Sequence, residues 1–336
     1  MGSGTPSGSG EEPSGSPLSW GDGPCGGSVA EVGTILSRPV PGCRGTPATG
    51  NLQAMSRHVA IVTDSTAYLP HRESERHRIT SVPLTVVLGD EALDEGTEIS
   101  ARALEQAMRR RLPVTTSRPA PEQFARTYAA LAAEGADEIV SLHLSAELSG
   151  TYDAAVLAAK EAPVPVRVVD TGMVAMALGF CALAAAEATA KGAGADEAVA
   201  AVRARAAGST ALFCVDTLEH LRRGGRIGAA QALLGSALAV KPILELADGA
   251  IQLKEKVRTS GKALARLEEL VAEQVAQAGP VDLAVHHLAA EEKATALAER
   301  LAERLGTSGE LYVSEVGAVI GAHTGPGLVG VVVSPR

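Results

Sequence analysis

From residue 58 onward, short apolar runs alternate with helical patterns, and this alternation constrains the fold more than any other feature of the chain. Runs typical of strands lie at 59–62, 139–142 and 166–169, and helical patterns at 101–111, 122–134 and 151–162. The extended stretch 79–88 contains Pro83, which favours an edge or irregular path. This pattern predicts a mainly parallel sheet with helices on both faces, where ligands bind at the carboxyl ends of strands.

The second half of the chain follows a less regular pattern. Strands are predicted at 211–215, 242–246, 250–257 and 281–285 and near residues 311 and 328, with helices at 261–278 and 291–305. Asp248-Gly249, between two of these strands, is a strong hairpin signal. We therefore predict an α/β protein of two domains, an N-terminal α/β domain at 58–208 and a C-terminal α+β domain at 209–336. A ligand cleft is expected near their boundary.

Residues 1–57 differ sharply from the rest in composition. The first 54 positions hold 13 glycines and 7 prolines, whereas the remaining 282 hold 23 and 11. Such a segment cannot bury enough apolar surface to offset the entropy of ordering it, so we expect a disordered tail. We interpret it as a dispensable extension or the result of a mis-assigned start codon, and a tether for a partner is the alternative.

Composition and charge argue against several functional classes. The net charge is −9 and Phe, Trp and Tyr total only 8, so neither a phosphate-neutralising surface nor base-stacking platforms are expected for nucleic acid. Four scattered cysteines predict neither a disulfide framework nor a zinc site, and the pair His286-His287 has no further ligand at metal-binding spacing. The most apolar window, 173–190, carries Glu187 and indicates a buried helix rather than a membrane span. Without a signal-peptide pattern, we expect a cytoplasmic protein.

A hydroxyl-rich turn precedes the helix expected at 151–162. Ser149, followed by Gly150 and Thr151, lies at or near the N-cap, where free N–H groups and the helix dipole favour an anion. In the simplest interpretation Ser149 only caps the helix. A serine nucleophile is the second interpretation, although the G-x-S-x-G pattern and an adjacent His/Asp pair are missing.

A second hydroxyl-rich segment, 115–119, precedes the helix expected at 122–134 and contains Thr116 and Ser117. It too can be explained by capping alone. If both segments are loops of successive βα units, however, they converge at one edge of a parallel sheet and can hold a carboxylate together. Farther along, a basic loop with Arg226 lacks the nucleotide-binding glycine patterns, and a flexible loop near the end carries His323.

These segments, in this order, resemble the DegV family, the fatty-acid-binding proteins that serve bacterial fatty acid kinase. The matching segments are VTDSTAYLP at 62–70, TTSRPAPEQF at 115–124, LSAELSGTYDAA at 144–155, VVDT at 168–171, VDTLEHLRRGGRIG at 215–228, VKPIL at 240–244, KVRT at 256–259 and GPGLVG at 325–330. The resemblance extends from about residue 58 to the C-terminus, and the glycine-rich tail has no counterpart in it.

The resemblance implies a two-domain protein that buries one long-chain fatty acid, with the carboxylate near the domain boundary. The residues it implies in ligand binding are Asp64, Ser65, Thr116, Ser117, Ser149, Gly150 and Thr151, and those it implies facing a kinase or a phosphate are Arg226, Arg258 and His323. Among these, Ser117, with Thr116 beside it, and Ser149 are expected to hold the carboxylate.

We therefore expect a lipid-binding protein without a cofactor that presents a fatty acid to a separate kinase, which forms the acyl phosphate used in phospholipid synthesis. It would be a substrate-presenting subunit rather than an enzyme, with no catalytic or metal-ligating residues of its own, and transient membrane contact is left open. The alternatives are a hydrolase with Ser149 as nucleophile, or a phosphotransfer enzyme using the loop 222–228, acting on a small acidic substrate. A sensor whose two domains close on an acidic ligand is a third alternative.

Overall fold

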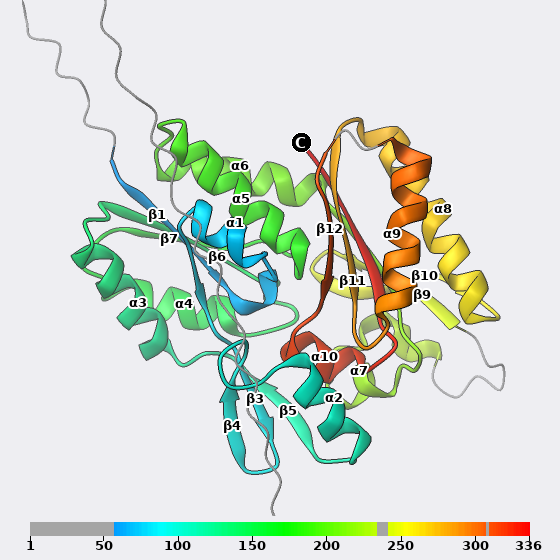
Figure 1. The fold of residues 1–336 in the computed structure, drawn as a ribbon. Helices are drawn as coiled ribbons and strands as arrows, with labels where there is room; N and C mark the ends of the chain where they lie inside the picture. Colours follow the sequence, from blue (N-terminus) through cyan, green and yellow to red (C-terminus); the bar gives the residue numbers. More distant parts are fainter. Residues whose placement is uncertain (1–56, 234–240, 307–308) are drawn as a thin grey trace, which may run out of the picture. The chain divides into compact units, whose positions relative to one another are not determined.

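The computed structural model describes residues 57–233, 241–306 and 309–336, and its first half is built on a four-stranded sheet (Figure 1). The strands are β1 (Val59–Asp64), β2 (Ile79–Val82), β6 (Glu138–His143) and β7 (Val166–Asp170), in the order β2-β1-β6-β7. All of their pairings are parallel. The parallel sheet predicted from the alternating pattern is therefore confirmed.

Helices cover both faces of this sheet because successive residues of a strand point to opposite sides. Val62 packs with Phe124 in one hydrophobic cluster, and its neighbour Ile61 packs with Leu178 in another. The covering helices are α3 (Pro121–Ala133) and α4 (Thr151–Ala159) on the first face and α5 (Met176–Ala190) and α6 (Ala195–Gly208) on the second. Because β1 and β6 are buried along their whole length, the sheet forms the central layer between two layers of helices.

A small antiparallel sheet follows β2, where Pro83 ends one strand and the chain changes sheets. Its strands are β3 (Thr85–Leu88), β4 (Glu91–Asp94) and β5 (Val114–Ser117), in the order β4-β3-β5, and α2 (Ala101–Arg109) connects the last two. The segment expected as a βα loop of the parallel sheet is thus partly a strand, because Thr116 pairs with Val86 and Ser117 with Thr85. The prediction of a loop at this place was wrong.

The second half contains a six-stranded sheet in the order β10-β9-β8-β13-β11-β12. The strands are β8 (Thr210–Cys214), β9 (Lys241–Ala247), β10 (Ala250–Val257), β11 (Val281–His287), β12 (Leu311–Glu315) and β13 (Val329–Pro335). The predicted hairpin at Asp248-Gly249 is confirmed, and both residues have the positive φ angles that such a turn requires. Two long helices, α8 (Ser260–Ala278) and α9 (Glu291–Leu305), cover one face of this sheet (Figure 1).

The other face of the six-stranded sheet belongs to the same hydrophobic cluster as α5 and the parallel sheet. That cluster joins Ile61 and Leu178 of the first half with Ala211, Leu246 and Val332 of the second. The change of sheet falls between α6 and β8, at the boundary predicted for the two domains, but the shared core joins both halves of the described chain into one packing unit. The division into two domains stays a prediction.

Short elements complete the described chain and carry several residues of the site. They are η1 (Ser65–Ala67), α1 (His71–Arg76), α7 (Glu219–Arg223), η2 (Gly228–Leu233) and α10 (Ala318–Thr324). Of the helices that the structure describes, none is long and apolar enough to cross a membrane, and the window predicted as a buried helix forms the buried α5. Residues 1–56, for which a disordered tail was predicted, lie outside the described residues.

Candidate functional site

A cavity lies where the parallel sheet, the small sheet and the six-stranded sheet meet. It contains about 1010 Å³ of space free of atoms, including the part open to solvent. Most of its lining is apolar: Leu84, Leu144, Leu148, Val174, Ala175, Ala211, Leu212, Phe213, Leu221, Leu246, Ile251, Val316, Val319, Ile320, Leu328, Gly330, Val331 and Val332. A concave apolar site with few polar groups is typical of small-molecule binding.

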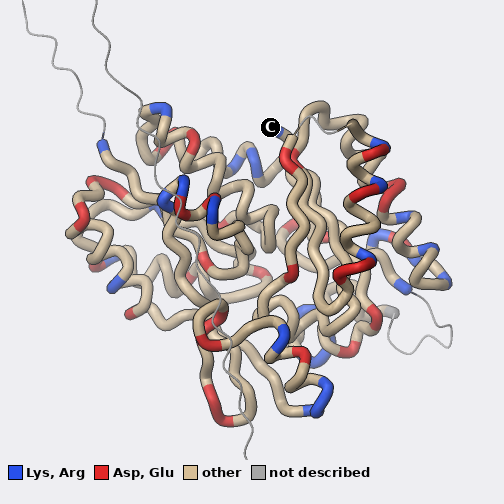
Figure 2. Tube along the Cα trace, viewed as in Figure 1, with Lys and Arg blue, Asp and Glu red and all other residues tan. Residues whose placement is uncertain are grey.

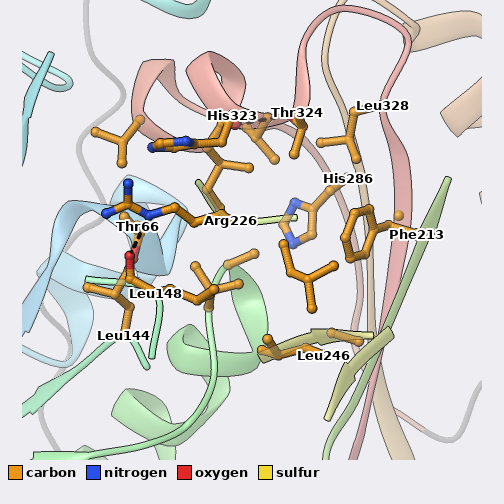
Figure 3. Close-up of a pocket in the computed structure, with 18 of the residues that line it drawn as sticks. Thr66, Leu144, Leu148, Phe213, Arg226, Leu246, His286, His323, Thr324 and Leu328 are labelled. Atoms are coloured by element: carbon orange, nitrogen blue, oxygen red, sulfur yellow. Dashed lines mark hydrogen bonds between the residues drawn. The ribbon is translucent and has the colours of Figure 1, made fainter. Parts of the chain in front are cut away.

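The polar lining residues gather mainly on one side of this cavity. They include Thr66, Thr116, Ser117, Arg118, Ser149, Arg226 and His323. Figure 3 shows Thr66, Arg226 and His323 on one side and Phe213, Leu246 and Leu328 on the other. Because Ser117 and Arg118 are exposed, this polar end is also where the cavity reaches solvent. We refer to it as the polar end.

Ser149 reaches the polar end from the residue before the N-cap of α4. The cap position is Gly150, and the Ser149 hydroxyl lies 2.9 Å from that of Thr151, which is buried. Gly150 and Thr151 are not among the lining residues, so they support the turn rather than face the cavity. A Cβ on Gly150 would lie 2.5 Å from Nη1 of Arg118, so glycine makes room for that side chain.

The Arg226 side chain is fixed by the backbone around it. Its Nε donates to the Leu148 carbonyl at 2.9 Å and its Nη1 donates to the Gly224 carbonyl at 2.6 Å. The third nitrogen, Nη2, has no hydrogen-bond partner within the described ranges. Arg226 therefore brings to the cavity a cation whose position the protein determines before any ligand arrives.

His323 lies in the last turn of α10 rather than in a flexible loop, so the loop prediction was wrong. Its Nε2 lies 2.8 Å from the Thr116 hydroxyl, while its Nδ1 is buried and has no partner in the described part of the chain. A Cβ on Gly224 would collide with Nδ1, which explains why a glycine stands there. Burial, with a smaller contribution from the Arg226 charge, lowers the pKa of His323 to about 4. The imidazole is therefore neutral at neutral pH.

Besides Gly150 and Thr151, three predicted site residues do not line the cavity. Asp64 is fully buried and accepts hydrogen bonds from the backbone N–H groups of Thr66 and Leu144, both of which line the cavity. The Ser65 hydroxyl donates a hydrogen bond to the carboxylate of Glu95, behind the residues that line the cavity. Arg258 follows β10, is exposed, and does not line the cavity. The expectation that Asp64 and Ser65 line the site is corrected, and the role predicted for Arg258 has no support in its position.

The remaining predicted residues do come together. Thr116, Ser117, Ser149, Arg226 and His323 all line the same cavity. The family model for uncharacterised proteins of the DegV family matches residues 58–336 of this chain. The chain belongs to the DegV family.

Relatives within the DegV family cover almost the whole described region. A DegV domain-containing protein of Streptomyces coelicolor is 71% identical over 282 residues, which are 84% of this chain and 100% of the relative. A solved DegV family protein from Thermus thermophilus, described as binding fatty acid, is 36% identical with a TM-score of 0.78, covering 83% of this chain and 100% of its own. Bacillus subtilis DegV, described as a fatty acid binding protein, is 35% identical with the same TM-score and coverage.

Some residues of this DegV site were not found from the sequence. Thr66 stands next to the two predicted residues of the T-D-S motif and is the one that lines the cavity. The sequence signal for Thr66 is Asp64 at the N-cap of η1, because the backbone N–H two positions after the cap donates a hydrogen bond to the cap's side chain. Arg118 and His286 were also missed. Neither could be assigned to the cavity from its own segment, because only the fold brings the residue after β5 and the strand β11 to one cavity.

Behind the DegV cavity, the buried carboxylate of Glu95 connects η1 with α10. It accepts hydrogen bonds from the Ser65 hydroxyl at 2.5 Å, the Tyr68 hydroxyl at 3.1 Å and the backbone N–H of Val319 at 2.7 Å. Burial raises the pKa of Glu95, and its three hydrogen bonds only partly offset that effect. Glu95 thus holds the first turn of α10, the helix that carries His323, against η1.

A second hollow adjoins the polar end of the DegV cavity and shares Thr116, Arg226 and His323 with it. Its other charged or titratable lining residues are Arg111, His220 and Arg223, and among the described residues no Asp or Glu lines it. Figure 2 shows further basic residues at the end of α2, where Arg109, Arg110 and Arg111 are exposed. In a chain of net charge −9, this basic hollow is suited to an anion.

Buried histidines should make this DegV protein sensitive to acid. Burial is the main cause that lowers the pKa of His286 to about 4, as it does for His323. Because the unfolded chain takes up these protons from about pH 6.5 downward and the folded state only near pH 4, stability falls as the pH falls through that window. Each imidazole should cost about 2 kcal/mol between about pH 7 and about pH 4.5.

Chemical denaturation at the two pH values measures this loss. His286→Gln removes one of the two groups, so its free energy of unfolding should fall by about 2 kcal/mol less than that of the wild type. His71→Gln, on the exposed helix α1, is the matched control and should follow the wild type. Equal losses in the wild type and His286→Gln would contradict the prediction.

Proposed function

We propose that this protein binds one long-chain fatty acid, with the hydrocarbon chain in the apolar part of the cavity and the carboxylate at the polar end. The observation that carries the proposal is the separation of one cavity into an apolar body and a polar end. The DegV proteins of Thermus thermophilus and Bacillus subtilis, both described as binding fatty acids, support the same ligand class.

The energetics favour such a ligand. Each buried methylene contributes about 0.8 kcal/mol, so the hydrocarbon chain supplies most of the favourable free energy. A carboxylate is too costly to bury without partners and must remain where donors are available. Arg226 offers its unused Nη2, and the hydroxyls of Ser117 and Ser149 lie on the same lining. The polar end can therefore hold the charge while the chain is buried.

We further propose that the bound acid is presented to a separate fatty acid kinase, in the cytoplasm, for acyl-phosphate formation in phospholipid synthesis. The position of the basic hollow next to the polar end supports this, because a phosphoryl group arriving there would meet Arg111, Arg223 and Arg226. The nucleotide would be held by the kinase, and this chain would act as the substrate-presenting subunit. With a purified kinase and Mg-ATP, acyl phosphate should form only when the loaded protein is present.

A serine hydrolase is the alternative that one observation favours. Ser141, His143 and Asp64 are hydrogen-bonded in the order of a nucleophile triad, with 2.8 Å between Ser141 and His143 and 3.1 Å between His143 and Asp64. All three side chains are fully buried, however, and Ser141 does not line the cavity. Ser149 does line it, but the only partner of its hydroxyl in the described residues is Thr151. A serine-directed phosphonate should therefore leave the protein unlabelled.

The direct test of the proposal is to extract the purified protein and identify bound lipid by mass spectrometry. We expect about one fatty acid per chain, or uptake of one on addition. Ser117→Ala and Ser149→Ala should each weaken binding by about tenfold, since each removes a hydrogen bond to a charged group. Ser74→Ala, on exposed α1, is the control and should bind normally. Absence of both bound acid and uptake would show that the proposal is wrong.

A further inference from the structure

A chain of buried hydrogen bonds ends at the wall of the cavity. The Tyr128 hydroxyl donates to the Ser141 hydroxyl at 2.8 Å, and Ser141 lies 2.8 Å from Nε2 of His143. Nδ1 of His143 lies 3.1 Å from Oδ2 of Asp64. Asp64 then accepts from Thr66, which lines the cavity. All five side chains are fully buried, so the chain connects α3 to η1 through the parallel sheet without access to water.

The donors fix the direction of every bond in this chain. Burial raises the pKa of Tyr128 to about 12, so its hydroxyl keeps its proton and donates. The Ser141 hydroxyl accepts this hydrogen bond and in turn donates one to Nε2 of His143, its one other partner among the described residues. Because Nε2 accepts, the ring proton is on Nδ1 and is donated to Asp64. The imidazole is thereby fixed in its Nδ1–H tautomer.

At the end of the chain, all four acceptor positions of Asp64 are occupied. Oδ1 accepts from the backbone N–H of Thr66 at 3.1 Å and from its hydroxyl at 2.5 Å. Oδ2 accepts from His143 and from the backbone N–H of Leu144 at 2.9 Å. A carboxylate has about four such positions, so Asp64 is saturated with donors. Leu144 begins the loop that leads to Ser149, and both residues line the cavity.

We infer that Asp64 and His143 are positioning residues for the polar end of the cavity, a conclusion that rests on the fatty-acid function proposed above. Asp64 holds Thr66 on one side and the start of the loop to Ser149 on the other, and His143 prevents its carboxylate from turning. The Ser-His-Asp order thus serves to orient binding groups and not to activate a nucleophile. Tyr128 and Ser141 only determine the tautomer of His143, so the chain's effect on the ligand is expected to weaken with distance from Asp64.

Asp64→Asn is the sharpest variant because it keeps the shape and reverses the polarity of one atom. In either orientation the new NH₂ group faces two donors, those of Thr66 or those of His143 and Leu144. Affinity for a fatty acid such as palmitate should fall by about tenfold or more in protein that remains folded. Thr66→Val should lose about tenfold, whereas Thr66→Ser, which keeps the hydroxyl, should bind like the wild type.

Two comparisons separate positioning from simple loss of stability. The Asp64→Asn/Thr66→Val double variant should lose less affinity than the product of the two single losses, because Asp64 acts partly through Thr66. Tyr128→Phe, at the far end of the chain, should lower the melting temperature yet bind within about twofold of the wild type. Losses that multiply, or an equal loss of affinity in Tyr128→Phe and Asp64→Asn, would overturn the inference.

A measurement on the wild-type protein tests the chain of buried hydrogen bonds without any ligand. Long-range ¹H–¹⁵N correlation should show His143 as the Nδ1–H tautomer, with its signal assigned by comparison with His143→Gln. Observation of the Nε2–H tautomer would overturn the inference. Because this measurement uses the wild-type protein, it also decides the matter if Asp64→Asn does not fold. If the wild type binds no fatty acid, the proposed function fails. If it binds one and neither Thr66→Val nor Asp64→Asn changes the affinity, only the positioning inference fails.

Discussion

Replacing Glu95 with alanine should lower the free energy of unfolding by about 3–5 kcal/mol and should weaken fatty-acid binding as well. The carboxylate is the acceptor for three donors, the hydroxyls of Ser65 and Tyr68 and the backbone N–H of Val319. Each buried donor left without a partner costs about 1–3 kcal/mol. Binding is affected because Val319 and His323 both line the cavity from α10.

Two further variants, Glu95→Gln and Gly317→Ala, identify the cause of the losses of stability and affinity. Gln keeps an acceptor for Val319 but turns an NH₂ group toward another donor, so it should cost less than alanine, about 1–2 kcal/mol near neutral pH. A Cβ on Gly317 would collide with Oε1 of Glu95, so Gly317→Ala should reproduce the loss of affinity while leaving Glu95 in place. Chemical denaturation and fatty-acid titration of the same samples measure both effects.

The pH dependence gives a further check on Glu95. Because burial raises its pKa, the folded protein holds this proton to higher pH than the unfolded chain does. The contribution of Glu95 to stability therefore falls as the pH rises above about 4.5, the direction opposite to that of the buried histidines. Because glutamine does not titrate, the stability of Glu95→Gln should lack this fall with rising pH. An alanine variant as stable as the wild type would contradict the assignment of Glu95 as the acceptor that holds α10.

The elements predicted correctly from the sequence are those whose pattern is local. β1 reads as a strand because four consecutive apolar residues are buried on both faces, and Asp248-Gly249 indicates its hairpin without reference to the rest of the chain. The long helices α8 and α9 carry their own periodicity and were placed within a residue of their observed ends. In these segments local propensity and tertiary structure agree, so sequence alone was sufficient.

The elements predicted wrongly depend on distant partners. β5 lies between prolines and resembles a loop, but it pairs with β3, and that pairing determines its conformation. The seven residues of α10 are bounded by glycines, and the last four of them, which include His323, were expected as part of a loop. Their first turn is held by Glu95, 224 positions away in the sequence. No local pattern reports such a contact.

The site shows the same limit at the level of single residues. Thr116, Ser117, Ser149, Arg226 and His323 could be named from motifs, but the motifs did not show which side of the chain faces the cavity. In the T-D-S-T stretch, the acidic side chain turns inward to serve as a cap, and the threonine two positions later is the residue that lines the cavity. Because adjacent residues exchange roles with a small change in backbone direction, motif position predicts a site only to within one or two residues.

Ala211→Phe should reduce the affinity for an 18-carbon fatty acid by about 100-fold while leaving the protein folded. Ala211 lies in β8 beside Leu246, which Figure 3 shows on the apolar side of the cavity, away from Arg226. A phenyl ring there would occupy the space of about four methylenes, and at about 0.8 kcal/mol each the loss is about 3 kcal/mol. The added volume enters space free of atoms, so the cost of overpacking is avoided.

A residue of the adjacent strand β9 provides the control. Ile243 is fully buried in the cluster of α8 and α9, on the opposite face of the sheet, and does not line the cavity. Ile243→Phe should therefore lower stability by about 1–3 kcal/mol and leave affinity within about twofold when the protein is folded. In Ala211→Phe, a 10-carbon acid should bind nearly as well as in the wild type, because its shorter chain stops before the ring. Isothermal titration with both acids distinguishes the cases: unchanged binding of the long acid to Ala211→Phe would mean that the hydrocarbon chain does not follow this wall.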